Sequence, residues 1–155
     1  SLQSGSITMK IVSSLALVVA VGSIFGCSTV PDSQVTNVPL NATSINAGNI
    51  ARPIMMSDGK ATVFWFAVSG ESMGSALPGR LEAYIYSGSC ASLGAKPAYD
   101  MNDGPNARFY SQASHQYFWK SAPVAVETLR AGGYALVVRE SPADGHQAIF
   151  CGNLS

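Results

Sequence analysis

Residues 70–74 read GESMG and match the G-x-S-x-G nucleophile elbow of serine hydrolases. In that motif the serine, here Ser72, attacks a carbonyl while a histidine takes its proton and an acid orients the histidine. The remaining triad members could come from Asp100, Asp103, Asp144, His115 and His146. The elbow requires a helix directly after the serine, and the sequence SALPG at 75–79 cannot form one because of its proline and glycine. A small serine hydrolase is therefore only the second alternative, and we expect no catalytic residues.

Soft ligands for a metal ion are the second chemical possibility. The chain has two histidines, whereas a catalytic zinc site usually takes three protein ligands. Methionine thioethers together with imidazoles would suit Cu(I). The candidate ligands on this reading are His115, His146, Met73 and Met101. The competing interpretation is that the methionines pack in a core and the histidines lie on loops and strand ends. We expect no cofactor, and a periplasmic copper-binding protein is the first alternative.

Large aromatic side chains offer a third possibility, a binding surface. They lie on expected strands that could be neighbours: Trp65, Tyr84, Tyr86, Tyr117 and Trp119. If one sheet face left them exposed, they would form an apolar patch for a protein, a glycan or a lipid. The competing interpretation places them in the core. Of these three kinds of partner, a protein best suits a domain that is tethered at a cell surface, which is the location that the N-terminal residues described below indicate.

Composition narrows the range of partners. The 155 residues are enough for one ordinary domain, and only 12% are charged, with nine Lys and Arg against nine Asp and Glu. The charges are scattered singly, so a basic surface for nucleic acid is not expected.

A leader occupies residues 9–26. Lys10 precedes a mainly apolar run, 11–24, that is short for a membrane span and typical of a secretory signal peptide. The closing residues IFGC resemble the lipobox of bacterial lipoproteins, in which a small residue precedes the cysteine to be acylated. That resemblance implies a lipidated Cys27 that attaches the protein to a membrane, where each buried methylene contributes ~0.8 kcal/mol. It also implies the outer membrane, because Ser28 is not an aspartate. The alternative is an ordinary signal peptide with an incidental cysteine.

Apart from Cys27, the chain has two cysteines, and both lie in the part that follows the leader. Cys90 and Cys151 have no C-x-x-C spacing and no neighbouring histidines that would indicate a redox or metal role. In an exported protein the simplest outcome is that they pair. We therefore expect one disulfide.

Strand patterns dominate the rest of the chain. Residues 61–69 are β-branched and aromatic, and 80–86 alternate with Leu81 and Ile85 on one face and the tyrosines on the other. The stretch 129–154 reads as a glycine corner, a strand 134–138 that is apolar on both faces, a loop and a closing strand. Residues 91–105 are expected to be a loop with a short strand near Tyr99, and 124–127 to lead into the corner, with one helical turn near Thr128. Seven or eight short strands indicate an all-β, antiparallel Greek-key sandwich.

A family resemblance supports this fold. YIYSGSC at 84–90, together with LRAGGYALVVRESPADG at 129–145 and the terminal CGNL, resembles small exported β-sandwich domains related to Cu,Zn superoxide dismutase and CHRD domains. Where that pattern has histidines, this chain has Tyr84, Tyr86 and Arg139. The resemblance thus implies the fold without the metal site, and the copper alternative includes a degenerate dismutase-like protein.

The expected organisation has four parts: a cloning remnant or upstream extension (1–8), the signal peptide (9–26), a lipidated N-terminus and flexible tether (27–47), and the sandwich (48–155). The layout also resembles Gram-negative lipoproteins of uncharacterised function. The sequence therefore predicts a non-catalytic lipoprotein of the cell envelope that acts as a binding or structural module. From that location alone, host antibodies are a further expected partner.

Overall fold

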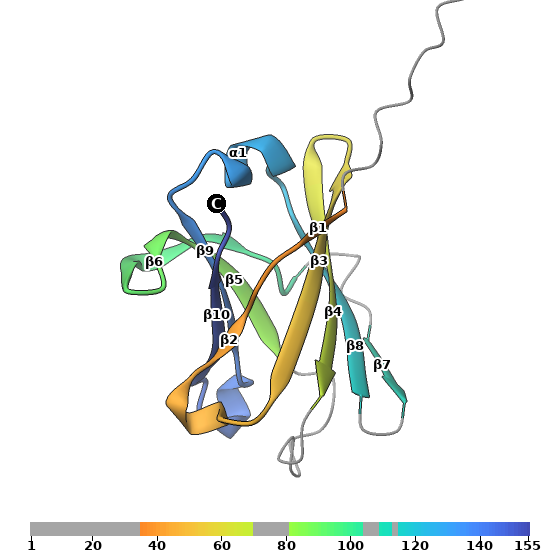
Figure 1. Ribbon diagram of the computed structural model, residues 1–155, viewed down its shortest axis with the longest axis vertical. Coiled ribbons are helices and arrows are strands. Elements are labelled where there is room, and N and C mark those ends of the chain that lie inside the picture. The colour runs from red at the N-terminus through yellow and green to blue at the C-terminus, as the bar shows by residue number, and fades with distance from the viewer. Residues whose placement is uncertain (1–34, 70–80, 104–108, 113–114) are drawn as a thin grey trace, which may run out of the picture. The chain divides into compact units, whose positions relative to one another are not determined.

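Two antiparallel sheets of five strands each face each other in the part of the chain that the structure describes (Figure 1). The computed structural model describes residues 35–69, 81–103, 109–112 and 115–155, with the backbone alone at 109–112 and 115–116. In spatial order the first sheet contains β1 (Thr36–Asn37), β3 (Ile50–Asp58), β4 (Ala61–Ser69), β8 (His115–Ala122) and β7 (Phe109–Gln112). The second contains β2 (Asn41–Ala42), β10 (Ala148–Asn153), β9 (Tyr134–Arg139), β5 (Glu82–Ser89) and β6 (Ser92–Asp100).

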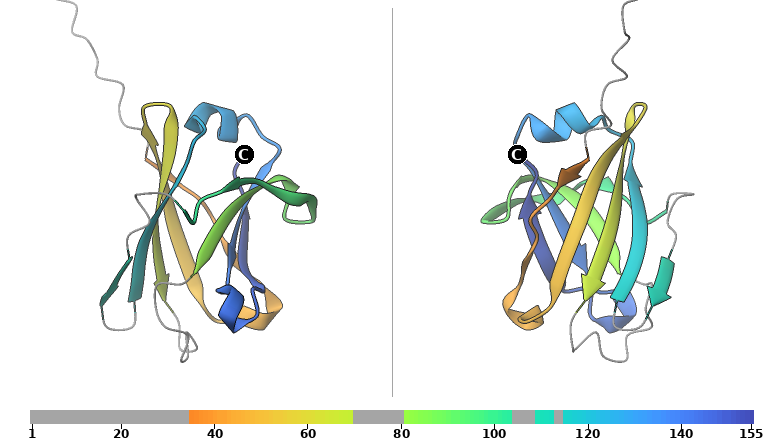
Figure 2. Two further views of the ribbon diagram at one scale, coloured as in Figure 1. Left: turned by 180° about the vertical axis from the view of Figure 1, so that it is seen from behind. Right: turned by 45° about the vertical axis from the view of Figure 1, so that its right-hand side comes forward.

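The order of the strands is that of a Greek-key sandwich. Hairpins join β3 to β4, β5 to β6, β7 to β8 and β9 to β10. Non-consecutive strands are also neighbours, because β4 pairs with β8 in the first sheet and β5 pairs with β9 in the second. Figure 2 shows α1 (Val126–Arg130) at one end of the sandwich and the 3-10 helices η1 (Ser44–Asn46) and η2 (Pro142–Asp144) at the other. The all-β sandwich expected from the sequence is confirmed.

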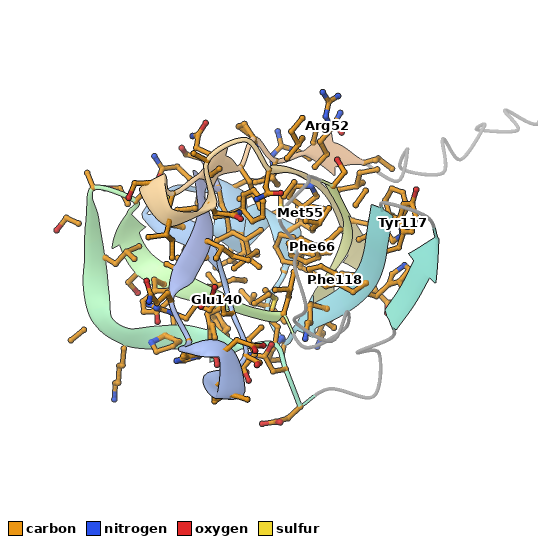
Figure 3. All side chains as sticks on the ribbon, turned by 90° about the horizontal axis from the view of Figure 1, so that it is seen from below. Arg52, Met55, Phe66, Tyr117, Phe118 and Glu140 are labelled. Carbon is orange, nitrogen blue, oxygen red and sulfur yellow. A yellow bond between two sulfur atoms is a disulfide. The ribbon has the colours of Figure 1, made fainter. Side chains whose placement is uncertain are left out.

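The core lies between the sheets and follows from the two-residue period of the strands. On β4, Phe64 and Phe66 are fully buried whereas Trp65 between them is only half-buried. Met55, Phe66 and Phe118 point into the space between the sheets, whereas Arg52 and Tyr117 lie on the outer side (Figure 3). Each large side chain buried in this way contributes about 1.5–3 kcal/mol relative to an exposed one.

The second sheet has a further apolar cluster on its outer face. It contains Tyr84, Tyr86 and Val137, with Leu93, Ala148 and Cys151 packed against them. On β9, Leu136 and Val138 belong to the main core while Val137 belongs to this outer cluster. The central strand is therefore covered on both faces, as the apolar sequence YALVV predicts.

The disulfide lies on the same side. Cys90, in the turn between β5 and β6, is bonded to Cys151 on β10, with 5.9 Å between their Cα atoms. The expected pairing is thus confirmed. Because the two cysteines are 61 positions apart in the sequence, loop-closure entropy gives ~4 kcal/mol of stabilisation.

Two segments differ from the expectation, and a third agrees with it. Residues 92–100 form a nine-residue edge strand, β6, and not a loop with a short strand, because an edge tolerates Pro97 and the two bulges in its pairing with β5. The helical turn expected near Thr128 is present as helix α1, whose buried Val126 and Leu129 lie three positions apart. The sandwich also includes β1 and β2, which lie before the expected boundary at 48.

The residues between β1 and β2 cross from one sheet to the other. Val38 donates its backbone N–H to Pro53 of the first sheet, and Thr43, just after β2, donates to Ile149 of the second. Gly152 is needed at this crossing, because a Cβ there would lie 2.2 Å from the carbonyl oxygen of Pro39. This chain segment therefore ties the two sheets together along one side.

Candidate functional site

A network of polar side chains covers the outer face of the second sheet. We call it the tyrosine–histidine network, and its members are Glu82, Tyr84, Tyr86, Arg139 and His146. Four of them come from β5 and β9, which pair so that Glu82 lies opposite Arg139 and Tyr84 opposite Val137. The fifth, His146, follows η2 and has a positive φ of 55°.

Glu82 is the centre of this network. Its Oε2 lies 2.8 Å from Nε2 of His146 and also accepts a hydrogen bond from the Tyr84 hydroxyl, which itself lies 3.2 Å from Nε2 of His146. Burial raises the pKa of the Tyr84 phenol above its ordinary value, and the negative charge of Glu82 raises it further. Tyr84 therefore stays protonated and acts as a hydrogen-bond donor.

Arg139 makes the remaining contacts of the tyrosine–histidine network. Its Nη2 donates to the Tyr86 hydroxyl at 3.2 Å, its Nη1 donates to the carbonyl oxygen of His146 at 3.2 Å, and its guanidinium carbon lies 5.7 Å from the centre of the Tyr86 ring. The guanidinium therefore joins β5, β9 and the loop after η2. These bonds fix the side chains to one another.

Tyr84, Tyr86 and Arg139 thus lie together on the outer face of the second sheet. Phenols and a guanidinium are poor metal ligands compared with imidazoles. Among the described residues, no group of three or more His, Cys, Asp or Glu is placed to hold a metal ion.

The four candidate copper ligands have different surroundings. Met101 is buried at 1% exposure in the main core, and His146 contacts Glu82 and Tyr84. Only the backbone of His115 is described, opposite Ser69 on β4, and Met73 lies outside the described residues.

The hydrolase residues can be placed only in part, because the GESMG stretch with Ser72 also lies outside the described residues. Asp100 accepts hydrogen bonds from the backbone and side chain of Asn102, and Asp144 accepts one from Ser141 at 2.6 Å. These two carboxylates thus have roles in local turns.

The five candidate aromatics do not form one face, because the strands that carry them belong to different sheets. Tyr84 and Tyr86 are buried in the outer cluster of the second sheet, whereas Trp65, Tyr117 and Trp119 lie on the outside of the first. All three of the latter are half-buried. The Trp65 ring stacks on Tyr117 with 5.6 Å between centroids and contacts Trp119 at 6.4 Å.

Strand register extends these three rings into a surface, which we call the aromatic face. Three rows of side chains cross β3, β4 and β8 on the outside of the first sheet. The rows are Arg52–Ala67–Tyr117, Ile54–Trp65–Trp119 and Met56–Val63–Ser121. Each of these side chains is half-buried or exposed, whereas the residues that alternate with them on the three strands are buried. The aromatic face is therefore largely apolar and partly exposed.

A second site was not predicted. Lys120 points inward from β8 with 7% exposure, and its ammonium donates to Oδ1 of Asn102 at 3.1 Å. Burial lowers the pKa of this lysine, although the carboxylates of Glu82, Asp100 and Asp103 act in the opposite direction. The sequence contained a signal, since Lys120 has the same strand parity as Phe118 and Ala122, which are both buried.

Cys27 lies outside the described residues. In the described part of the chain, no helix is long and apolar enough to cross a membrane. No protein-family model, no curated protein and no solved structure matches this chain. A function must therefore be inferred from its own residues.

Proposed function

We propose that this protein is a non-catalytic, lipid-anchored module of the bacterial cell envelope that binds a protein partner through its aromatic face. The observation that carries the proposal is the set of contacts among Trp65, Tyr117 and Trp119 on the outer side of the first sheet. An apolar surface of this kind on a soluble domain is typical of an interaction site.

The types of residue favour a protein over a glycan or a lipid. Trp, Tyr, Met and Arg are enriched in the centres of protein–protein interfaces, and the aromatic face has all four, with Arg52 and Met56 beside the rings. Charged groups, which are depleted in such centres, are represented in the three rows by Arg52 alone.

Anchoring is the part of the proposal that depends on residues 9–28. Acylation of Cys27 would hold the domain at the outer membrane, and exposure there would also make it accessible to host antibodies. Metabolic labelling with an alkyne fatty acid should mark the protein, and Cys27→Ala should abolish the label. A label that persists in Cys27→Ala contradicts the anchor.

Binding is tested by photo-crosslinking in cells that produce the full chain. A photoreactive phenylalanine analogue at Ala67, in the middle of the aromatic face, should give a discrete adduct with one envelope protein. The same analogue at Lys96, on the exposed edge strand β6, is the matched control. Trp65→Ala combined with Trp119→Ala removes two anchor residues and should weaken binding about thirtyfold. An adduct of equal strength at both positions, or one that the double variant retains, contradicts the proposal.

A further inference from the structure

The hollow beside Lys120 is separate from the aromatic face. Its volume is about 430 Å³, which lies in the range of small-molecule sites. Its walls come from both sheets and from η2: Leu81, Glu82, Asn102, Lys120, Ser141, Pro142 and Ala143. A fixed cation, a fixed carboxylate and apolar side chains thus surround one space.

The ammonium of Lys120 has no direct anionic partner among the described residues. Among the described residues, Lys120 has no carboxylate oxygen within 4.0 Å, and the acceptor of its hydrogen bond is the neutral amide of Asn102. That amide is itself fixed, because its oxygen also accepts from the backbone of Ala83 at 2.8 Å and its nitrogen donates to Asp100 at 2.7 Å. An ammonium has three donors, and a buried charge is stable only when it is paired. An anionic group in the hollow would supply that pairing.

The carboxylate is equally well placed. Glu82 is held by Tyr84 and His146, both through Oε2. Its side chain keeps 22% of its surface exposed, so it can receive a further donor from the hollow. A cationic group would be the complementary partner here.

A ligand with a single charge fits poorly. An inorganic anion at Lys120 would meet the negative charge of Glu82 in the same hollow and of Asp100 and Asp103 nearby. A simple amine at Glu82 would meet the ammonium of Lys120. A ligand with both charges satisfies both ends.

We propose that the hollow binds a free α-amino acid as its zwitterion. Its carboxylate accepts hydrogen bonds from Lys120, its ammonium donates to Glu82, and an aliphatic side chain packs on Leu81, Pro142 and Ala143. This site is independent of the aromatic face.

The test is an NMR titration of the full chain with L-leucine. The amide resonances of Ala83 and Asn102, at the edge of the hollow, should shift saturably. Acetate and propylamine carry one half of the charge pattern each, so both should bind at least about tenfold more weakly than leucine. If acetate binds as tightly as leucine, the site is a simple anion site and the zwitterion proposal is wrong.

Variants locate the site. Lys120→Met and Glu82→Gln should each weaken leucine binding at least about tenfold, because each removes one charge partner. Lys96→Met, at an exposed lysine of β6, should leave it unchanged. Trp65→Ala with Trp119→Ala should also leave it unchanged, which separates this site from the proposed protein-binding face. Thermal melts establish whether each variant folds. If Lys120→Met does not fold, the effect of Glu82→Gln on leucine binding alone tests the proposed site. The absence of saturable shifts, or equal binding by Glu82→Gln, overturns the inference.

Discussion

Replacing Lys120 by methionine should stabilise the folded protein. Lys120 as a residue is 7% exposed, and the hydrogen-bond partner of its ammonium is one amide oxygen at 3.1 Å. Methionine has nearly the same length and volume but no charge to desolvate. Asn102 does not lose its last partner, because its oxygen still accepts from the backbone N–H of Ala83.

The magnitude follows from two opposing terms. Desolvation of a buried ion costs several kcal/mol, whereas its hydrogen bond to Asn102 recovers about 1.5–3 kcal/mol. The carboxylates of Glu82, Asp100 and Asp103 recover a further part. We expect a net gain of about 1 kcal/mol for Lys120→Met, which raises Tm by roughly 4 °C for a domain of this size.

The pH dependence gives the same reasoning an independent check. The pKa of Lys120 in the folded protein is below its ordinary value of 10.5, so the unfolded chain binds more protons in the interval between the two values. Stability of the wild type therefore rises with pH through that interval. The advantage of Lys120→Met should be largest at neutral pH and should disappear above pH 10.5, where the lysine is neutral in both states.

Urea denaturation at a series of pH values measures the difference between the two proteins, and Lys96→Met on the exposed edge strand is the matched control. A Lys120→Met protein that is less stable than the wild type at pH 7, or a difference that does not change with pH, would refute the account of a poorly matched buried ammonium.

Three other predictions concern the rest of the fold. Gly152→Ala should lower the free energy of unfolding by about 2 kcal/mol in urea denaturation, because its Cβ would lie 2.2 Å from the carbonyl oxygen of Pro39. The control Ser92→Ala, at an exposed position, should change the free energy of unfolding little. Equal effects of the two substitutions would contradict the close packing at Gly152. The double variant Cys90→Ala with Cys151→Ala should have a free energy of unfolding lower by ~4 kcal/mol in the same assay. A double variant as stable as the wild type would show that the disulfide does not stabilise the fold. The pKa of Tyr84 is raised in the folded state, first by burial and then by Glu82, so its contribution to stability is present below pH 10 and is lost as the pH rises above 10. Tyr84→Phe should therefore show a smaller alkaline loss, and a pH profile identical to that of the wild type would argue against a raised pKa at this phenol.

Local patterns predicted much of the fold. The alternation at 80–86 correctly separates two faces: Ile85 is in the main core, and Tyr84 and Tyr86 are on the opposite face. The glycine corner before β9 is also confirmed, since Gly132 and Gly133 both have positive φ. These features depend on neighbours in the sequence.

The features that the sequence did not predict depend on residues that are far apart in the sequence. Pro97 argues against a strand until it is known that β6 lies at the edge of its sheet. Glu82 and His146 are 64 residues apart, and nothing local to either residue indicates that they meet. Assigning the five aromatics to two sheets likewise required the pairing of β5 with β9 and of β4 with β8.

The crossing segment of β1 and β2 has a mechanical consequence. Tension applied to the chain from before Val35 would act first on two strands of two residues each, one at the edge of each sheet. Their few hydrogen bonds would yield before the long pairing of β3 with β4. The loop closed by Cys90 and Cys151 would stay shut, so the crossing segment would detach from the sheets while the rest of the domain stays folded.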